Sequence, residues 1–436
     1  MPNDESKVGP VAAAPPRETP SAVSPPTPLS RRTILAGMAA SAGAAFMAKF
    51  PQAPTGAPSP VPVQTDDPSL VPGPATSAVS VRSPFENPAR TPAGVLTGSS
   101  LTPIHELTGS ITPSDLVFER HHNGVPLIDP KKYKLLVHGL VRRPLVFTLE
   151  DLKRFPSVSR VHFLECSGNG RTAYRTPKPE LTPQMVDGLT SNGEWTGVPL
   201  AELLREVGAR DSAKWIIAEG GDASKLVRSV PIEKAMSDAL LAYAFNGEPL
   251  RPPNGYPARL FLPGFEGSTN VKWVRRLELV EQPMMARDET AKYTDPLANG
   301  TSRQFSFEMD AKSIITYPAY PARLAGRGWV EISGLAWSGR GRIARVDVST
   351  DAGKTWTAAA LQEPILAKAH TRFRLMWDWD GSPTTIMSRA IDETGYVQPT
   401  RATFEAGRGK GTDYHFNYIR AWAVRDDGSV VYEVPA

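Results

Sequence analysis

The pattern of apolar and polar positions changes twice along the chain. Between residues 115 and 310, short apolar runs that are typical of strands are mixed with amphipathic segments that are typical of helices. Strands are predicted at 133–140, 145–148, 160–165, 215–219 and 258–262, and helices after Thr148, at 200–207 and from 232 through 237 to 241. Strands and helices do not repeat as regular βαβ units, so the pattern predicts an α+β fold.

Between residues 311 and 436 the pattern is almost entirely one of strands. Apolar runs recur about every ten residues and are separated by turn residues such as Ser338-Gly339 and Asp427-Gly428. The runs lie at 330–337, 343–349, 355–360, 372–379, 385–391 and 419–424. Regular short strands with Gly and Asp turns indicate an immunoglobulin-like β-sandwich. We place the boundary between the two regions near residue 310.

The first hundred residues show neither pattern. They hold 19 of the 43 prolines and many Ala, Ser and Thr residues, so they bury too little apolar surface to offset chain entropy. Arg31-Arg32 follows Ser30 and precedes small and apolar residues as far as Phe50, which predicts a twin-arginine export signal. The alternative is a chance arginine pair before an Ala-rich helix. The apolar stretch is short for a membrane span, which needs about 20 residues.

These features predict a signal region over residues 1–50 and a proline-rich disordered linker over 51–100. They also predict export of a folded protein to the periplasm, with no membrane span. The mean hydropathy of -0.28 excludes a polytopic membrane protein. The 49 basic and 45 acidic residues give a net charge of +4 without a basic run, so no nucleic-acid partner is expected.

The number of cysteines excludes several kinds of metal, haem and disulfide site. The single cysteine, Cys166, excludes an internal disulfide, a Cys-rich zinc site, a Cys-ligated iron–sulfur cluster and c-type haem attachment. Cys166 ends an apolar run and begins a Gly-rich turn, which can present a side chain to a pocket. Arg171 would favour the thiolate if it lies close by. A buried, inert cysteine is the alternative and the commoner state of a lone cysteine.

Two further segments could bind an anion. In the run FERHH at 118–122, neighbouring histidines on a strand face opposite ways and rarely share a metal ion, whereas Arg120 suits an oxyanion. A solvated polar loop is the alternative. Between 254 and 273, Gly264 and Gly267 permit close approach of a ligand, and Arg259 and Lys272 could hold an anion. On local grounds alone, Asp222 and Tyr293 carry no specific signal.

Together these segments resemble the sulfite oxidase family of molybdenum enzymes over roughly residues 100–436. F-x-R-x-H at 118–122 resembles its pterin-binding opening, and ECSGNGR at 165–171 resembles its molybdenum-ligand loop. GYPARLFLPG and NVKW resemble its second pterin clamp, and the run at 334–356 resembles its dimerisation domain. Within the family, the runs at 292–295, 390–401 and 414–417 resemble the molybdenum subunit of the sulfane dehydrogenases of thiosulfate oxidation.

The resemblance implies a molybdopterin-binding oxidoreductase domain of the sulfite oxidase type over 101–310 and a β-sandwich dimerisation domain over 311–436. It implies one Mo-molybdopterin per chain and no haem on this chain, with Cys166 as metal ligand and with Arg259 and Lys272 paired with the cofactor phosphate. The implied cofactor-binding residues are Phe118, Glu119, Arg120, His121, His122, Cys166, Asp222, Asn254, Arg259, Asn270, Val271 and Lys272. Asn254 is a departure, because a histidine is common there. Arg120, Arg171 and Tyr293 match the substrate pocket and, with Cys166, form the implied catalytic set.

The implied reaction is oxidation of sulfane sulfur on a sulfur-carrier protein, with a separate c-type cytochrome subunit as electron acceptor and a homodimer within a hetero-oligomer. A sulfite dehydrogenase, also with a cytochrome c acceptor, is the alternative within the family. A further pocket arginine of the family has no match near Trp422, which weakens that alternative. Other classes are a cofactor-less carrier-binding protein and a cysteine hydrolase, for which no histidine partner is identified.

Overall fold

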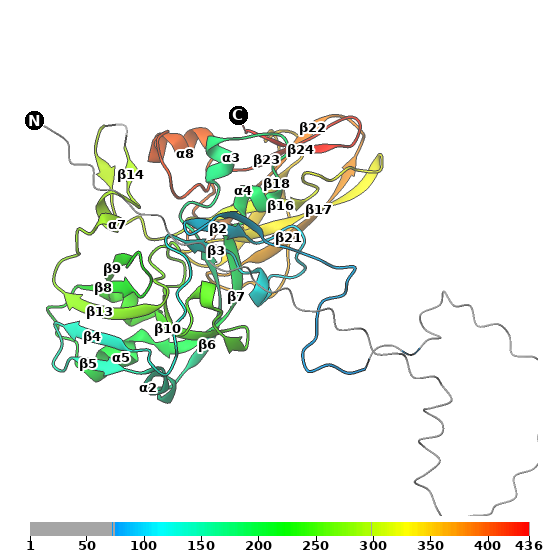
Figure 1. Cartoon of the computed structure of the whole chain (residues 1–436). Coiled ribbons are helices and arrows are strands. Elements are labelled where there is room, and N and C mark those ends of the chain that lie inside the picture. Colours follow the sequence, from blue (N-terminus) through cyan, green and yellow to red (C-terminus); the bar gives the residue numbers. More distant parts are fainter. Residues whose placement is uncertain (1–71, 73–74, 298, 436) are drawn as a thin grey trace, which may run out of the picture. The chain divides into compact units, whose positions relative to one another are not determined.

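The computed structural model describes residues 72, 75–297 and 299–435 of the chain (Figure 1). The predicted twin-arginine signal lies outside these residues, as does much of the predicted linker. The first paired strands are β1 (Thr91–Gly94) and β2 (Gly98–Leu101), which form an antiparallel hairpin. Paired structure therefore begins inside the segment 51–100 that the sequence predicts to be disordered.

Three sheets build the first part of the fold. Their further strands are β3 (Glu119–His121), β4 (Leu135–Gly139), β5 (Leu145–Phe147), β6 (Val158–Glu165), β7 (Thr190–Pro199), β8 (Trp215–Gly220), β9 (Val227–Pro231), β10 (Leu240–Phe245), β11 (Glu248–Pro249), β12 (Arg259–Phe261) and β13 (Val274–Val280). The strand orders are β1-β2-β3, then β11-β10-β7-β6 with β12 beside β10, and then β5-β4-β13-β8-β9. Only β4 and β13 run parallel within these sheets of the described residues, so regular βαβ units are absent there, as predicted.

Short helices connect these strands. They are α2 (Leu149–Arg154), α3 (Arg171–Arg175), α4 (Pro183–Asp187), α5 (Leu200–Val207), α6 (Ile232–Ser237) and α7 (Arg287–Thr290), with 3-10 turns at Ser114–Leu116 and Pro252–Asn254. The predicted start of α2 is confirmed, because Thr148 and Asp151 form a reciprocal capping box. The amphipathic segment predicted at 200–207 is α5, whose buried face packs into the core of the first part.

The expected continuation of the helix from 237 to 241 is wrong. α6 ends at Ser237, and Leu240 and Leu241 begin β10. Both leucines are fully buried, and β10 pairs with β7 on one side and β12 on the other. An interior strand is apolar on both faces, so its pattern does not distinguish it from a buried helix.

Two sheets build the C-terminal part, which we call the β-rich domain. They contain β16 (Lys312–Tyr317), β17 (Gly328–Trp337), β18 (Ile343–Ser349), β19 (Thr357–Ala358), β20 (Ala360–Leu361), β21 (Thr371–Trp379), β22 (Thr384–Asp392), β23 (Ala421–Val424) and β24 (Val430–Glu433). The orders are β16-β17-β21-β20 and β19-β18-β22-β23-β24. Trp337, Phe373 and Trp422 are fully buried in the core that both sheets share. The immunoglobulin type of this domain stays a prediction.

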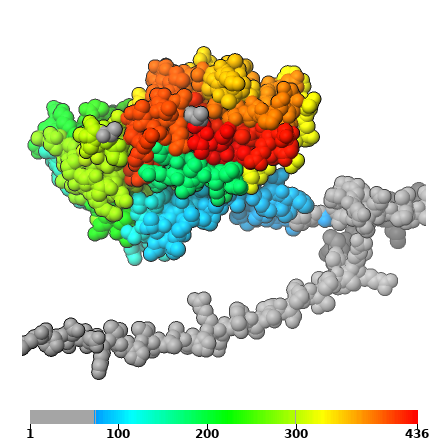
Figure 2. Space-filling view, turned by 90° about the horizontal axis from the view of Figure 1, so that it is seen from above, coloured from blue at the N-terminus to red at the C-terminus, as the bar shows by residue number. Residues whose placement is uncertain are grey.

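The two parts of the fold meet in a common core. A small hairpin of β14 (Asp295–Pro296) and β15 (Ser302–Arg303) precedes the β-rich domain, and α8 (Arg401–Arg408) lies within it. Phe163 and Val186 from the first part belong to the same apolar cluster as Trp337. On the face seen in Figure 2 the green segment after α3 lies against the red C-terminal strands, where the Tyr432 amide donates to the Pro179 carbonyl (2.9 Å). No helix among the described residues is long and apolar enough to span a membrane.

Candidate active site

A pocket with about 730 Å³ of empty space, open solvent included, lies beside the end of β6. Residues of the predicted set on its wall are Phe118, Arg120, His121, His122, Cys166, Asp222, Asn254, Arg259, Asn270, Val271, Lys272 and Tyr293. Two predicted residues are not on this wall. Glu119 contacts the outer side of His121, and Arg171 lines an adjoining pocket. The structure thus brings together side chains that are widely separated in the sequence.

Cys166 lies where β6 gives way to the turn before α3. Its backbone N–H donates to the Leu189 carbonyl (2.9 Å). A neighbouring loop approaches because Gly267 has no side chain, and a Cβ there would lie 2.8 Å from the Glu165 carbonyl oxygen. Burial raises the pKa of the Cys166 thiol, and the nearby arginine charges offset this only in part. Arg120 and Arg171 therefore do not bring the pKa of the thiol below its ordinary value, and a bound metal ion would favour the thiolate further.

Arg259 places a positive charge in the pocket wall, and no carboxylate of the described residues pairs with it. It is 3% exposed, and its guanidinium donates to the carbonyl oxygens of Asn254 and Asn270, both at 2.9 Å. Its Nε has no partner among the described residues, and burial lowers its pKa to about 9. A buried charge without a counter-ion is costly, so this wall favours an anion such as phosphate.

Lys272 lies beside Arg259, but its donors are already used. Its Nζ donates to the Arg120 carbonyl (3.0 Å), the Pro253 carbonyl (2.9 Å) and Nδ1 of His121 (2.8 Å). His121 Nε2 in turn lies 3.1 Å from the Glu119 carboxylate and donates to it. Burial lowers the pKa of Lys272 well below its usual value. The predicted contact of Lys272 with phosphate would therefore require one of these three bonds to open.

Asp222 contributes a free acceptor to the same wall. Its Oδ2 accepts the Ser224 hydroxyl (2.5 Å), whereas its buried Oδ1 has no partner among the described residues. Together with Arg259 and Cys166, it fits the molybdopterin that the sequence resemblance implies. Arg259 suits the phosphate, Asp222 suits an N–H group of the pterin, and the sulfur of Cys166 suits a soft metal.

An outer pocket continues from the first one toward the solvent. The two pockets share Arg120, His122, Cys166 and Tyr293. The outer one encloses about 1270 Å³, including open solvent, and is also lined by Arg171, Arg287, Lys292, Asp413 and Tyr414. Positive side chains outnumber the one carboxylate on its wall. An anionic substrate is therefore drawn toward Cys166.

Tyr293 stands between the two pockets. Its hydroxyl lies 3.0 Å from Nε2 of His122, and its backbone has a φ of 52°, which is strained for a tyrosine. Burial raises the pKa of Tyr293 and, together with the charge of Arg120, lowers the pKa of His122. At neutral pH the pair is therefore uncharged and holds one proton between phenol and imidazole. His121, the last residue of β3, and His122, which follows the strand, have separate partners.

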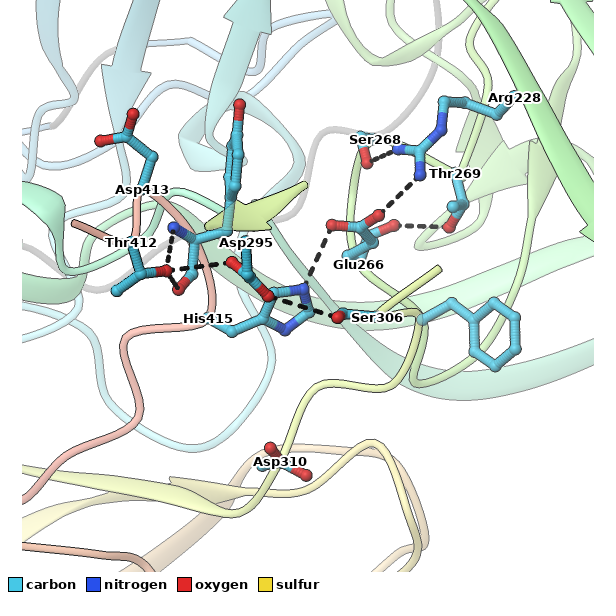
Figure 3. Close-up of polar contacts among 12 residues, drawn as sticks. Arg228, Glu266, Ser268, Thr269, Asp295, Ser306, Asp310, Thr412, Asp413 and His415 are labelled. Atoms are coloured by element: carbon cyan, nitrogen blue, oxygen red, sulfur yellow. Dashed lines mark hydrogen bonds and ion pairs between the residues drawn. The ribbon is translucent and has the colours of Figure 1, made fainter. Parts of the chain in front are cut away.

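A buried ionic network supports Tyr293 from beneath its ring. The Arg228 guanidinium lies 4.6 Å from the ring centre and pairs with Glu289 at 2.9 Å. It also pairs with Glu266 at 2.8 Å (Figure 3). Glu266 also contacts Nε2 of His415 at 3.3 Å. All four charged or titratable residues are at most 3% exposed. The network fixes the strained position of Tyr293 and connects it to the β-rich domain.

Residues 412–415, which we call the C-terminal strap, join separate parts of the site. The carbonyl of Asp413 accepts two hydrogen bonds from Arg171 (2.6 and 3.2 Å). The ring of Tyr414 packs 5.2 Å from that of Tyr293. The amide of His415 donates to the carbonyl of Ser167, beside Cys166 (2.7 Å). The strap thus adds residues of the β-rich domain to the wall of the outer pocket.

Sequence reasoning assigned no role to the strap. Tyr414 belongs to the run 414–417, which contributes only to the family resemblance. No local sequence pattern marks Asp413 or Arg287 as a site residue. Asp413 meets Arg171 across 242 positions of sequence, so no spacing rule could have paired them. Trp273 also lines the inner pocket; it is the last residue of the NVKW motif, and its place in that motif is the signal that could have identified it.

Two protein families match the chain. Residues 122–287 match the oxidoreductase molybdopterin binding domain, and residues 303–420 match the Mo-co oxidoreductase dimerisation domain. The two matches follow the two parts of the fold.

Individual relatives agree with these matches. The chain is 32% identical to mitochondrial sulfite oxidase of Mus musculus over 322 residues, covering 67% of this chain and 58% of that protein. It is 30% identical to sulfite oxidase of Gallus gallus over 361 residues, covering 76% and 78%. It is 33% identical to an NADH nitrate reductase of Phaseolus vulgaris over 302 residues, covering 62% and 34%. The chain therefore spans little more than half of the mouse protein and about a third of the bean protein.

A solved structure extends the likeness to the whole described fold. The crystal structure of the sulfane dehydrogenase SoxCD from Paracoccus pantotrophus aligns with a TM-score of 0.82 and 45% identity. The alignment covers 86% of this chain and 99% of that chain.

Proposed function

Since the chain belongs to the sulfite oxidase family of molybdopterin oxidoreductases, we propose that it oxidises a sulfur compound at a molybdenum centre held by Cys166. The observation that carries this proposal is the position of the only cysteine. Cys166 lies where an inner pocket suited to an anionic cofactor meets an outer pocket lined by cations. The β-rich domain, which matches a dimerisation family, supports a dimeric enzyme.

Side chains of the inner pocket would bind the cofactor, and side chains of the outer pocket would bind the substrate. Arg259 would pair with the cofactor phosphate, and Asp222 would accept a hydrogen bond from the pterin. The bound group supplies a two-electron acceptor that can transfer oxygen to sulfur. Arg120 and Arg171 attract and orient an anionic sulfur substrate above Cys166. The Tyr293 hydroxyl holds a proton, shared with His122, at the point where the two pockets meet.

We further propose that the substrate is sulfane sulfur on a carrier protein and that a c-type cytochrome accepts the electrons in the periplasm. The 45% identity to a sulfane dehydrogenase over most of the chain supports this choice. The predicted twin-arginine signal supports the compartment.

Sulfite dehydrogenase activity is the second candidate. The identity of about a third to animal sulfite oxidases favours it, and a pocket with Arg120 and Arg171 would accept sulfite equally well. The two candidates therefore differ in the substrate that reaches the pocket rather than in the residues at its base.

The deciding experiment compares two substrates on molybdenum-loaded protein with cytochrome c as acceptor. We expect rapid cytochrome reduction with a persulfidated carrier protein and weak reduction with micromolar sulfite. Efficient sulfite oxidation without activity on the carrier would establish the second candidate. Fully active protein without molybdenum would contradict both.

A further inference from the structure

Four buried charged side chains form a second network behind the Cys166 loop. Glu165 and Asp187 come from the first part of the fold, and Lys312 and Arg420 come from the β-rich domain; each is at most 1% exposed. Lys312 Nζ lies 2.7 Å from Glu165 and 3.1 Å from Asp187. Arg420 Nε lies 3.0 Å from Asp187. Two negative and two positive charges thus compensate one another where the two parts meet.

Glu165 connects this network directly to the cysteine. It is the last residue of β6, and neighbouring side chains on a strand point to opposite faces. Besides Lys312, its carboxylate accepts hydrogen bonds from Nε1 of Trp337 (2.7 Å) and from Nδ2 of Asn169 (2.9 Å). Because Asn169 follows Cys166 and Glu165 precedes it, the same carboxylate holds the loop on both sides of the cysteine.

Arg420 holds the far end of the loop. Gly170, with a φ of 93°, lies against its guanidinium, and a Cβ at Gly170 would collide with it. Arg420 also donates to the carbonyls of Phe416 (2.8 Å) and Tyr418 (2.9 Å). The guanidinium is therefore fixed within the β-rich domain, and the turn that follows Cys166 packs against it at Gly170.

We propose that Glu165, Lys312 and Arg420 are positioning residues that set the direction of the Cys166 side chain. The inference rests on the metal-ligand role proposed above for Cys166. Buried ion pairs are often no more stabilising than apolar side chains of the same size. The effect of this charge-compensated network is therefore to fix the orientation of the Cys166 loop. The β-rich domain then completes the site from behind the metal ligand, in addition to any part it has in dimer formation.

The test variant is Glu165→Gln combined with Lys312→Met, which removes one charge of each sign and leaves the second pair of the network intact. The first measurement is the rate at which iodoacetamide alkylates Cys166 in molybdenum-free protein. Because Cys166 is the only cysteine, the incorporated label reports on it alone. The second measurement is the molybdenum content per chain after loading and dialysis, with circular dichroism to verify folding.

The matched control is Asp238→Asn combined with Lys368→Met. This ion pair, at 2.6 Å, also joins the first part of the fold to the β-rich domain. We expect alkylation of Cys166 to be about tenfold faster in the test variant, and cofactor affinity to be about 10–100-fold lower, with the control close to wild type.

Equal alkylation rates in wild type, control and test variant would overturn the positioning proposal whatever the molybdenum content. If the test variant does not fold, Trp337→Phe takes its place, because it removes one donor to Glu165 and keeps both charges; an unchanged alkylation rate there overturns the proposal in the same way. Wild-type protein that binds no molybdenum would overturn the proposed function, and the alkylation rates would still decide the positioning of Cys166.

Discussion

Replacement of Arg228 by methionine would remove the guanidinium that pairs with both Glu266 and Glu289. All three side chains are almost fully buried, so water cannot replace the lost partner. Breaking a buried ion pair by removing one partner costs about 3–5 kcal/mol, because the remaining charge stays in a poorly solvated place. Glu266 keeps its contact with His415, which limits its share of the loss. We expect the free energy of unfolding at pH 8 to fall by about 3–5 kcal/mol.

The pH dependence of this loss has a definite sign. Burial raises the pKa of Glu266, but Arg228 and His415 outweigh it, so that pKa lies below its ordinary value. Burial keeps the pKa of Glu289 above its ordinary value despite Arg228. Without Arg228 both pKa values rise, so the folded variant binds protons more readily than the unfolded chain. The stability of the variant then increases as the pH falls, and its deficit relative to wild type narrows between pH 8 and pH 5.

Urea denaturation followed by circular dichroism at several pH values measures both effects. Arg374→Met is the control, because Arg374 is exposed on β21 and lies 3.7 Å from Glu331 at the surface. We expect the control to cost less than about 0.5 kcal/mol. A cost below about 1 kcal/mol for Arg228→Met, or a deficit that stays constant from pH 8 to pH 5, would refute the reasoning.

Three further changes test the proposed site and compartment. Cys166→Ser should abolish sulfur oxidation and leave the circular dichroism spectrum unchanged, because a hydroxyl is a poor substitute for a thiolate at molybdenum; wild-type turnover would contradict the assigned role. Arg259→Met should weaken retention of the pterin about 10–100-fold on dialysis, because it removes a charge-assisted bond to phosphate, and unchanged retention would exclude that bond. Arg31→Lys with Arg32→Lys should leave the protein in the cytoplasm, as cell fractionation measures, and undiminished periplasmic protein would argue against a twin-arginine signal.

Sequence pattern predicts well the elements whose apolar positions follow a clear period or whose ends are marked by turn residues. α5 matches its predicted range because its buried and exposed positions follow the helical period. β18 matches its range although its buried positions do not alternate, because turn residues flank its apolar run. The sequence pattern does not predict β7, because its sequence TSNGEWTGVP contains Asn, Gly and Pro and its apolar residues do not alternate with polar ones. Its buried polar residues are satisfied by tertiary contacts, such as that of Asn192 Nδ2 with the Ser110 carbonyl (2.9 Å). No local pattern encodes such contacts.

The residues of the candidate site also differ in how far the sequence predicts them. The motifs around Cys166 and Arg259 indicated most of the inner pocket, because each motif is continuous in sequence. The contacts that orient these motifs are not continuous. Lys312 meets Glu165 across 147 positions, and neither residue belongs to a pattern that predicts the other. Cofactor-lining residues were therefore accessible from sequence, whereas the residues that support them required the fold.

The C-terminal strap sets the order in which the site can be completed during biosynthesis. Residues 412–415 are translated after every other residue that lines the two pockets. Until they emerge from the ribosome and dock, Tyr293 and Ser167 lack the partners that the strap provides, and the outer pocket lacks the wall that Asp413 and Tyr414 form. Every residue that lines the inner pocket is translated before the strap. The outer pocket is therefore the part of the site that is completed last.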